Sequence, residues 1–235
     1  MAEVPEAGSE LERLVAVTAV LRAPGGCPWD AEQTHASLVQ YLTEETHELI
    51  EAIESGSREE MIEELGDVLY QVIFHADLAA HTPGEEFTIE DVAAHMTAKM
   101  VGRHPHVFGD LDLETAGDVE NAWDAFKAAE KPTRTSVLDG IPLGMPSLAL
   151  ADKLLGRARK VGVEVPAMPT QPLEPAQNEA ELGTQLLSIV AAAKSNGLDA
   201  ERALRGALRT LRTTITDAET PEAPTTQQAV PDDPR

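Results

Sequence analysis

The 235-residue chain has one cysteine, few aromatic residues and few basic residues. Because Cys27 is alone, no disulfide bond can form within the chain, which is typical of proteins from a reducing cytosol. Aromatic residues make up only 3% of the chain while alanine and leucine are abundant, and this favours helices. No GxxxxGK[S/T] sequence is present, which excludes the P-loop class of nucleotide-binding enzymes.

Basic residues are also scarce relative to acidic ones. Lysine and arginine total 18 against 41 aspartates and glutamates, which gives a net charge of −23. This charge opposes binding to nucleic acids and to anionic membranes, so we expect neither as a partner. The apolar run at residues 14–21 is too short to span a bilayer, and no basic segment of a signal peptide precedes it. We therefore expect a cytoplasmic protein.

Helical periodicity dominates the chain, and no segment alternates as a strand would. The pattern predicts an all-α fold with helices near residues 9–21, 37–54, 57–81, 88–102, 115–130, 147–161, 179–196 and 199–217. Ser37 with Gln40 and Ser57 with Glu60 resemble capping boxes that begin two of these helices. Four prolines at 165–177 predict an extended linker, and the polar end of the chain predicts a disordered tail.

Acidic residues enter the apolar faces of the two predicted helices at 37–54 and 57–81. Helical residues advance by about 100° each, which places Glu45 inside the stripe of Leu38 and Leu49, with Glu48 at its edge beside Tyr41. On the next helix a polar line runs along one face: Glu64, Asp67, Gln71 and His75. The short turn between the helices predicts antiparallel packing, which would bring the two sets of acids together.

Four carboxylates at close range repel one another by roughly 4 kcal/mol per pair at an effective dielectric constant near 20. A hard divalent cation would remove this conflict, and oxygen ligands favour magnesium or manganese over zinc. The pattern therefore predicts a metal site formed by Glu45, Glu48, Glu64 and Asp67. The alternative for any single acidic pair is a solvated helix face.

Magnesium held by carboxylates commonly serves phosphate substrates, which also need cationic groups. Lys99 and Arg103 are four residues apart, as are Lys127 and Lys131, and Trp123 lies one helical turn before Lys127. An indole beside a lysine could stack on a base while the lysine meets a phosphate. Composition alone leaves open the alternative that Trp123 belongs to the core and that the lysines are solvated.

Several segments together resemble the MazG family of nucleoside triphosphate pyrophosphohydrolases: GCPWDAEQTH, EETHE followed by EELGD, RHPHVF, and NAWDAFKAAEK followed by SVLDGIP. The resemblance covers about residues 10–162. It implies an all-α, four-helix-type bundle completed by dimerisation, with Mg²⁺ as cofactor, or Mn²⁺ in its place. It also implies hydrolysis of NTPs or dNTPs to the monophosphate and pyrophosphate, as part of cleaning the nucleotide pool.

The resemblance implies roles for individual residues at matching positions. It assigns metal binding to Glu45, Glu48, Glu64 and Asp67, in agreement with the helical-face argument. Substrate contacts are expected from the remaining matching positions, which are Lys99 and Arg103 for phosphate, Trp123 for the base, Lys127 for phosphate, and Tyr41. Glu44 or Glu48 would orient the attacking water, and the sequence does not decide between them.

The expected organisation is a catalytic domain at 1–162, a linker at 163–178, a truncated second MazG-like hairpin at 179–217 and a disordered tail at 218–235. The second hairpin is inferred from ELGT at 181–184, which echoes ELGD at 64–67 but lacks the aspartate. The alternative function is a regulatory or scaffolding bundle that retains a metal. A di-iron bundle would need a second E-x-x-H on another helix besides Glu44–His47, and no other predicted helix contains one.

Overall fold

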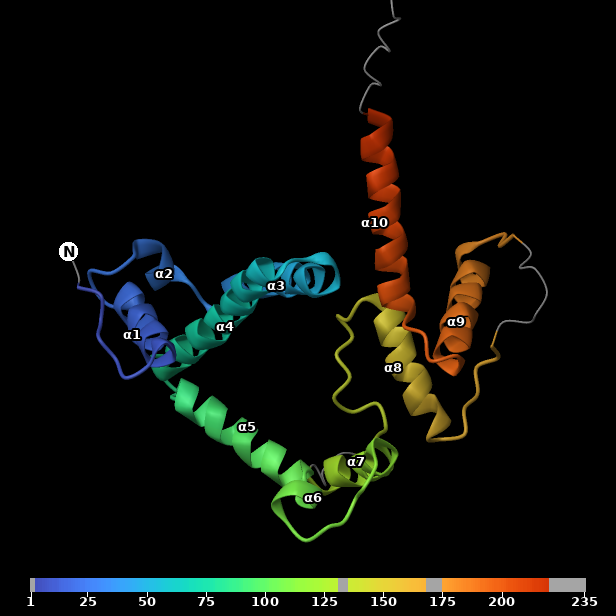
Figure 1. Cartoon of the computed structure of the whole chain (residues 1–235), viewed down its shortest axis with the longest axis horizontal. Coiled ribbons are helices and arrows are strands. Elements are labelled where there is room, and N and C mark those ends of the chain that lie inside the picture. Colours follow the sequence, from blue (N-terminus) through green and yellow to red (C-terminus); the bar gives the residue numbers. More distant parts are fainter. Residues whose placement is uncertain (1–2, 131–134, 168–174, 220–235) are drawn as a thin grey trace, which may run out of the picture. The chain divides into compact units, whose positions relative to one another are not determined.

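The computed structural model describes residues 3–130, 135–167 and 175–219, which form ten helices and no strand in those ranges (Figure 1). The predicted all-α class is therefore confirmed. The chain divides into two compact units, residues 1–130 and 131–235. The helices of the first unit are α1 (Glu10–Arg22), α2 (Pro28–Glu32), α3 (His35–Ser55), α4 (Arg58–Ala80), α5 (Ile89–Arg103), α6 (Pro105–Phe108) and α7 (Ala116–Glu130).

All eight predicted helices are present, and two short helices were missed by the sequence analysis. α2 and α6 both begin at a proline in segments that were expected to be loops. The predicted N-cap of α3 was also wrong by three residues: Thr34 is its N-cap, and Ser37 is the third helical residue that completes the capping box. Thr34 was overlooked because the apolar periodicity begins only at Leu38.

The hairpin of α3 and α4 forms the largest helix–helix contact in the described chain, and the predicted antiparallel neighbours are confirmed. Its turn is short because α3 ends at Gly56 and Ser57 immediately caps α4 through a capping box with Glu60. A Cβ at position 56 would lie 2.6 Å from the carbonyl oxygen of Ala52, so this tight turn requires glycine.

The core of the hairpin lies at the end away from this turn. Leu38 of α3 packs with Phe74 and Leu78 of α4, all nearly inaccessible to solvent, and Tyr41 and Tyr70 pack around them. The apolar face that the sequence predicts for the first half of α4 is not buried in the single chain. Five of its side chains are 38% to 54% exposed: Met61, Ile62, Leu65, Leu69 and Val72.

A buried arginine joins α1 and α2 to α4. The Nε atom of Arg22 donates to Oδ2 of Asp77 at 2.6 Å, Nη1 donates to the carbonyl oxygen of Asp30 at 2.9 Å, and the guanidinium lies 5.0 Å from the ring centre of Phe74. Tyr70 donates to the buried carboxylate of Asp30. The pKa of Tyr70 is raised to about 12, mainly because the side chain is buried and next because Asp30 is negatively charged. The phenol therefore stays a hydrogen-bond donor.

The second unit contains α8 (Ser147–Arg159), α9 (Glu179–Ser195) and α10 (Ala200–Glu219), which contact one another in all three pairs. Leu155 of α8 packs with Val190 and Ala191 of α9. Because α8 belongs to this unit, the expected domain boundary at 162 does not coincide with the division between the compact units. The expected tail is helical to Glu219, and residues 220–235, like 168–174 of the expected linker, lie outside the described residues.

No helix among the described residues combines the length and the apolarity that crossing a membrane requires.

Removing the Arg22 guanidinium should strongly destabilise the first unit. The side chains of Arg22 and Asp77 are only 11% and 13% exposed, so Arg22→Ala leaves a buried carboxylate without its counter-charge. We expect a loss of about 3 kcal/mol in the free energy of unfolding, measured by urea denaturation. The control is Arg13→Ala, which removes an exposed pair with Glu10 and should cost less than about 0.5 kcal/mol. Equal effects of the two substitutions would contradict a structural role for the buried pair.

Candidate functional site

Three of the four predicted metal ligands converge between α3 and α4. One carboxylate oxygen from each of Glu45, Glu48 and Glu64 lies within 4.8 Å of the others. They meet because Glu45 and Glu48 lie one turn apart on α3, and the tight turn at Gly56 sets Glu64 opposite them. Asp67 is not part of this group of three, but its charge acts on both Glu45 and Glu64.

The electrostatics of this group disfavour its ionised form. Burial raises the pKa of Glu45, and the charge of Asp67 and the carboxylate of Glu48 raise it further. Burial is also the largest cause of the raised pKa of Glu64, and the charges of Glu48 and Asp67 raise it further. Neighbouring carboxylates therefore add to the raised pKa values of Glu45 and Glu64, as expected for acids that approach without a counter-charge.

The residues present fit a divalent cation. Oε2 of Glu64 is shielded from solvent and has no hydrogen-bond partner among the described groups. Oxygens bound to one Mg²⁺ lie within about 4.2 Å of one another, because each bond measures about 2.1 Å. A small inward movement of the three carboxylates would therefore suffice. Oxygen-only donors suit Mg²⁺ or Mn²⁺ better than a softer metal.

A second cluster combines cations with an indole at the end of α5 and on α7. The guanidinium of Arg103 lies 5.8 Å from the ring centre of Trp123, and Nζ of Lys127 lies 5.9 Å from it. His104 meets the same indole edge-to-face at 5.5 Å. This arrangement brings three of the predicted substrate-binding residues together, which are Arg103, Trp123 and Lys127. Among the described side chains, Lys99 is not one of the cations over the indole.

The carboxylate group and the Trp123 cluster are built on different helices. In the described part of the chain, α7 packs against α5, and neither α3 nor α4 contacts α7. The single chain therefore holds a set of acids suited to a metal and a separate set of cations suited to phosphate. Glu44, the other predicted water-orienting residue, is exposed on α3 and lies outside the carboxylate group.

Sequence reasoning gave no role to Trp29, although it lies in the quoted segment GCPWDAEQTH. Its indole is 49% exposed and meets Tyr41 edge-to-face, with ring centres 5.6 Å apart. Tyr41 is half-buried on α3, one turn before Glu45. The proline before Trp29 could have signalled the start of α2, but the contact with Tyr41 depends on tertiary structure.

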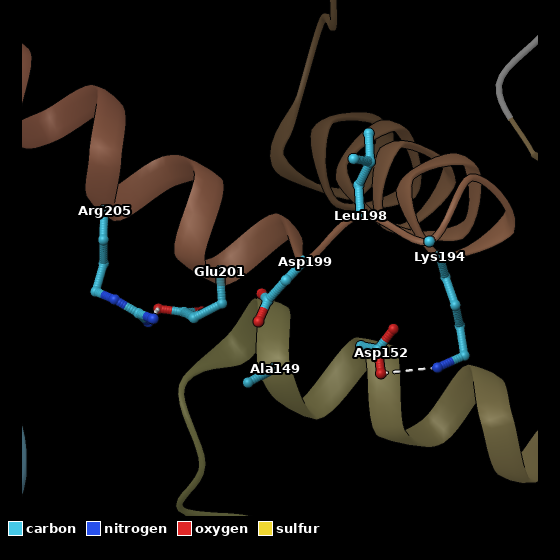
Figure 2. A pocket seen from close by; sticks show the side chains of 8 residues that line it. Ala149, Asp152, Lys194, Leu198, Asp199, Glu201 and Arg205 are labelled. Carbon is cyan, nitrogen blue, oxygen red and sulfur yellow. Dashed lines mark hydrogen bonds and ion pairs between the residues drawn. The ribbon is translucent and has the colours of Figure 1, made fainter. Parts of the chain in front are cut away.

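The second unit contains a charged cleft of about 490 Å³ between α8, the end of α9 and the start of α10. Figure 2 shows the ion pair that crosses it, in which Nζ of Lys194 lies 2.7 Å from Oδ2 of Asp152. Arg205 pairs with Glu201 at 3.5 Å on α10. Both cations of this cleft therefore face carboxylates.

Comparison with known proteins identifies relatives that match most of the chain. The model of the MazG nucleotide pyrophosphohydrolase domain matches residues 33–108, which include α3 and α4. The nucleoside triphosphate pyrophosphohydrolase/pyrophosphatase MazG of Thermotoga maritima is 41% identical over 219 residues, which cover 87% of this chain and 83% of that protein. The chain belongs to the MazG family.

Two further relatives show how this MazG protein compares in length. An uncharacterised 26.1 kDa protein of Streptomyces cacaoi is 48% identical over 208 residues, covering 88% of this chain and 83% of that protein. The nucleoside triphosphate pyrophosphohydrolase of Escherichia coli is 37% identical over 159 residues, covering 66% of this chain but only 60% of that protein. The chain thus spans most of the shorter relatives and a smaller part of the longer one.

Neutralising one acid of the carboxylate group should stabilise the metal-free protein. The folded state raises the pKa of Glu45 above 4.5, so ionised Glu45 opposes folding. This penalty begins to decrease as pH falls through the raised pKa, and it disappears below 4.5. Glu45→Gln should therefore raise the melting temperature at about pH 8 without metal, and the gain should shrink towards pH 4.5. In excess Mg²⁺ the original protein should instead have the higher melting temperature, because the Glu45 carboxylate can bind the metal and the glutamine of Glu45→Gln lacks that charge.

The control is Glu44→Gln, which alters an exposed acid outside the group and should leave the melting temperature nearly unchanged. A Glu45→Gln protein that is less stable than the original without metal at about pH 8 would contradict mutual repulsion in this group.

Proposed function

We propose that the protein hydrolyses nucleoside triphosphates to the monophosphate and pyrophosphate with Mg²⁺ bound by Glu45, Glu48, Glu64 and Asp67. The observation that supports this most directly is the convergence of three carboxylates, one with an unpartnered buried oxygen, within the segment that matches the MazG domain. The names of the Thermotoga and Escherichia relatives state the same reaction for those proteins.

The reaction combines attack of water on the α-phosphorus with departure of pyrophosphate. Bound Mg²⁺ would neutralise the triphosphate and polarise a phosphoryl oxygen. Glu48 is exposed and belongs to the carboxylate group, so its second oxygen can orient the attacking water and accept its proton. Glu44 lies outside the group, which favours Glu48 of the two sequence candidates. Arg103 and Lys127 would stabilise charge on the phosphoryl oxygens, together with Lys99.

A non-catalytic regulatory bundle is the second candidate, because the truncated hairpin at 179–217 has Thr184 where the first has Asp67 and no acidic cluster like EETHE before it. The nucleotide-pool role, the cytoplasmic location and the origin of that hairpin in a MazG repeat stay predictions.

Incubation with ATP and Mg²⁺ in ¹⁸O-labelled water tests the proposed bond cleavage. We expect AMP and pyrophosphate by phosphorus NMR, with the label in AMP, because water attacks the α-phosphorus. Asp67→Ala should lower turnover by about 1,000-fold through loss of metal binding, with unchanged helix content by circular dichroism. The control is Glu59→Ala, an exposed acid on the same helix.

Label in pyrophosphate would place the attack on the β-phosphorus, and release of orthophosphate would mean a different reaction. Retention of full activity by Asp67→Ala would contradict the metal site. A protein that binds Mg²⁺ but turns over no triphosphate would support the regulatory bundle.

We also propose that the protein is a homodimer in which α4 packs against a second copy. The argument is the exposed apolar face of α4, whose members Ile62, Leu65, Leu69 and Val72 are spaced three, four and three residues apart. This spacing places them on one side of the helix, as in helices that pack together along their length. An exposed face of this kind marks an interaction surface.

Ile62→Glu should convert the dimer to a monomer, because it places a charge in a desolvated apolar contact. Sedimentation equilibrium gives the mass directly. Leu143→Glu is the matched control, since Leu143 is 82% exposed in a turn of the other unit. An unchanged mass for Ile62→Glu would show that this face is not the interface.

A further inference from the structure

The helix α10 of the second unit presents its large apolar side chains to solvent. They follow one another at four, three and four residues, and each is 50% to 54% exposed: Leu204, Leu208, Leu211 and Ile215. This is the a/d spacing of a helix that pairs along its length with another helix. A continuous exposed row of this kind marks an interaction surface.

The charged side of α10 faces its own unit instead. Arg205 and Glu201 form an ion pair whose side chains are only 29% and 22% exposed, and both line the cleft beside α8 (Figure 2). An amphipathic helix that packs within its own chain usually turns its apolar face towards that chain. The contacts of α10 with α8 and α9 therefore do not account for its aliphatic row.

The charges beside this row are positive. Residues 202–216 contain four arginines and no acid, in a chain whose acids outnumber its basic residues by 41 to 18. With the aliphatic row at the a and d positions, Arg205 and Arg212 occupy the e positions. Charges at these positions lie beside the contact between paired helices and select the partner.

We propose that this face of α10 binds an acidic amphipathic helix of a partner protein. The partner helix has apolar residues at its a and d positions and glutamate or aspartate at the flanking e or g positions. Burial of the aliphatic row supplies the contact, and pairing of the exposed Arg212 with a partner acid supplies the selectivity. This inference goes beyond the proposed hydrolysis, because it gives a binding role to the unit that lacks a counterpart of Asp67.

Other occupants of this face are opposed by charge or gain nothing from it. In an antiparallel pair of two α10 helices, Arg205 and Arg212 of one copy would face the same arginines of the other and repel them. In a parallel pair they would face Ala207 and Thr214, which carry no charge. An anionic bilayer would repel a chain with a net charge of −23.

Two synthetic peptides that share one apolar seam and carry opposite flanking charges test the proposal. Repeats of EIAALEK have glutamate at e and g, and repeats of KIAALKE have lysine there. Fluorescence anisotropy of each labelled peptide, titrated with the full chain at about 0.15 M salt, gives its affinity. We expect the acidic peptide to bind more tightly, although the net charge of the chain favours the basic one.

Variants of α10 locate the binding. Leu211→Glu places a charge within the aliphatic row and should weaken binding of the acidic peptide by more than about tenfold. Arg212→Glu should weaken it by about fivefold and strengthen binding of the basic peptide, because an attractive pair becomes a repulsive one. The matched control is Leu186→Glu, since Leu186 is 43% exposed on α9 of the same unit, and it should change neither affinity. Circular dichroism checks that each variant keeps its helix content.

The other outcomes would overturn the proposal. These are no binding of the acidic peptide, or equal weakening by Leu211→Glu and Leu186→Glu. A lower mass of Leu211→Glu than of the original protein in sedimentation equilibrium would assign the face to a second copy. Binding to phosphatidylserine vesicles that Leu211→Glu abolishes, without binding of the acidic peptide, would assign it to a membrane surface. None of these measurements uses turnover, so failure of the proposed hydrolysis remains distinguishable.

Discussion

Repulsion among the carboxylates of α3 and α4 is the constraint on which the rest of the structure depends. The turn at Gly56 is too tight for Glu48 and Glu64 to avoid each other, and both helices are fixed there by caps. Apolar packing of Leu38 with Phe74 and Leu78 at the far end holds the helices together despite this repulsion. The hairpin therefore keeps an unfavourable charge cluster in place, which is the arrangement that a dication converts into a favourable one.

Arg22 connects this hairpin with the segments before it. One guanidinium binds the Asp77 carboxylate and the Asp30 carbonyl and covers the ring of Phe74, so it joins α1, α2 and the hairpin core. Because α2 has only five residues, its position is determined by these contacts rather than by its own helical stability. The same network that stabilises the first unit thus decides where Trp29 lies.

The helices and the acid-bearing faces of α3 and α4 were predictable because periodicity, caps and a short turn are local signals. The fold class and the proximity of Glu45, Glu48 and Glu64 follow from these signals alone. The contact of Trp29 with Tyr41, the pairing of Arg22 with Asp77 and the grouping of α8 with the second unit depend on tertiary packing, for which the sequence has no local pattern. Periodicity also marked the face of Ile62 and Leu69 as apolar without showing that the single chain leaves it exposed.

A triphosphate needs both a metal and cations, yet these groups occupy different helices of the first unit. The carboxylates belong to α3 and α4, while Arg103, Trp123 and Lys127 belong to α5 and α7, and in the described chain α7 reaches only α5. The exposed apolar face lies on α4, the same helix that carries Glu64 and Asp67. Residues advance by about 100° each along a helix, so this face and the line of Glu64 and Asp67 lie on different sides of α4. A second copy that covers the face therefore does not by that contact alone bring cations to the carboxylates.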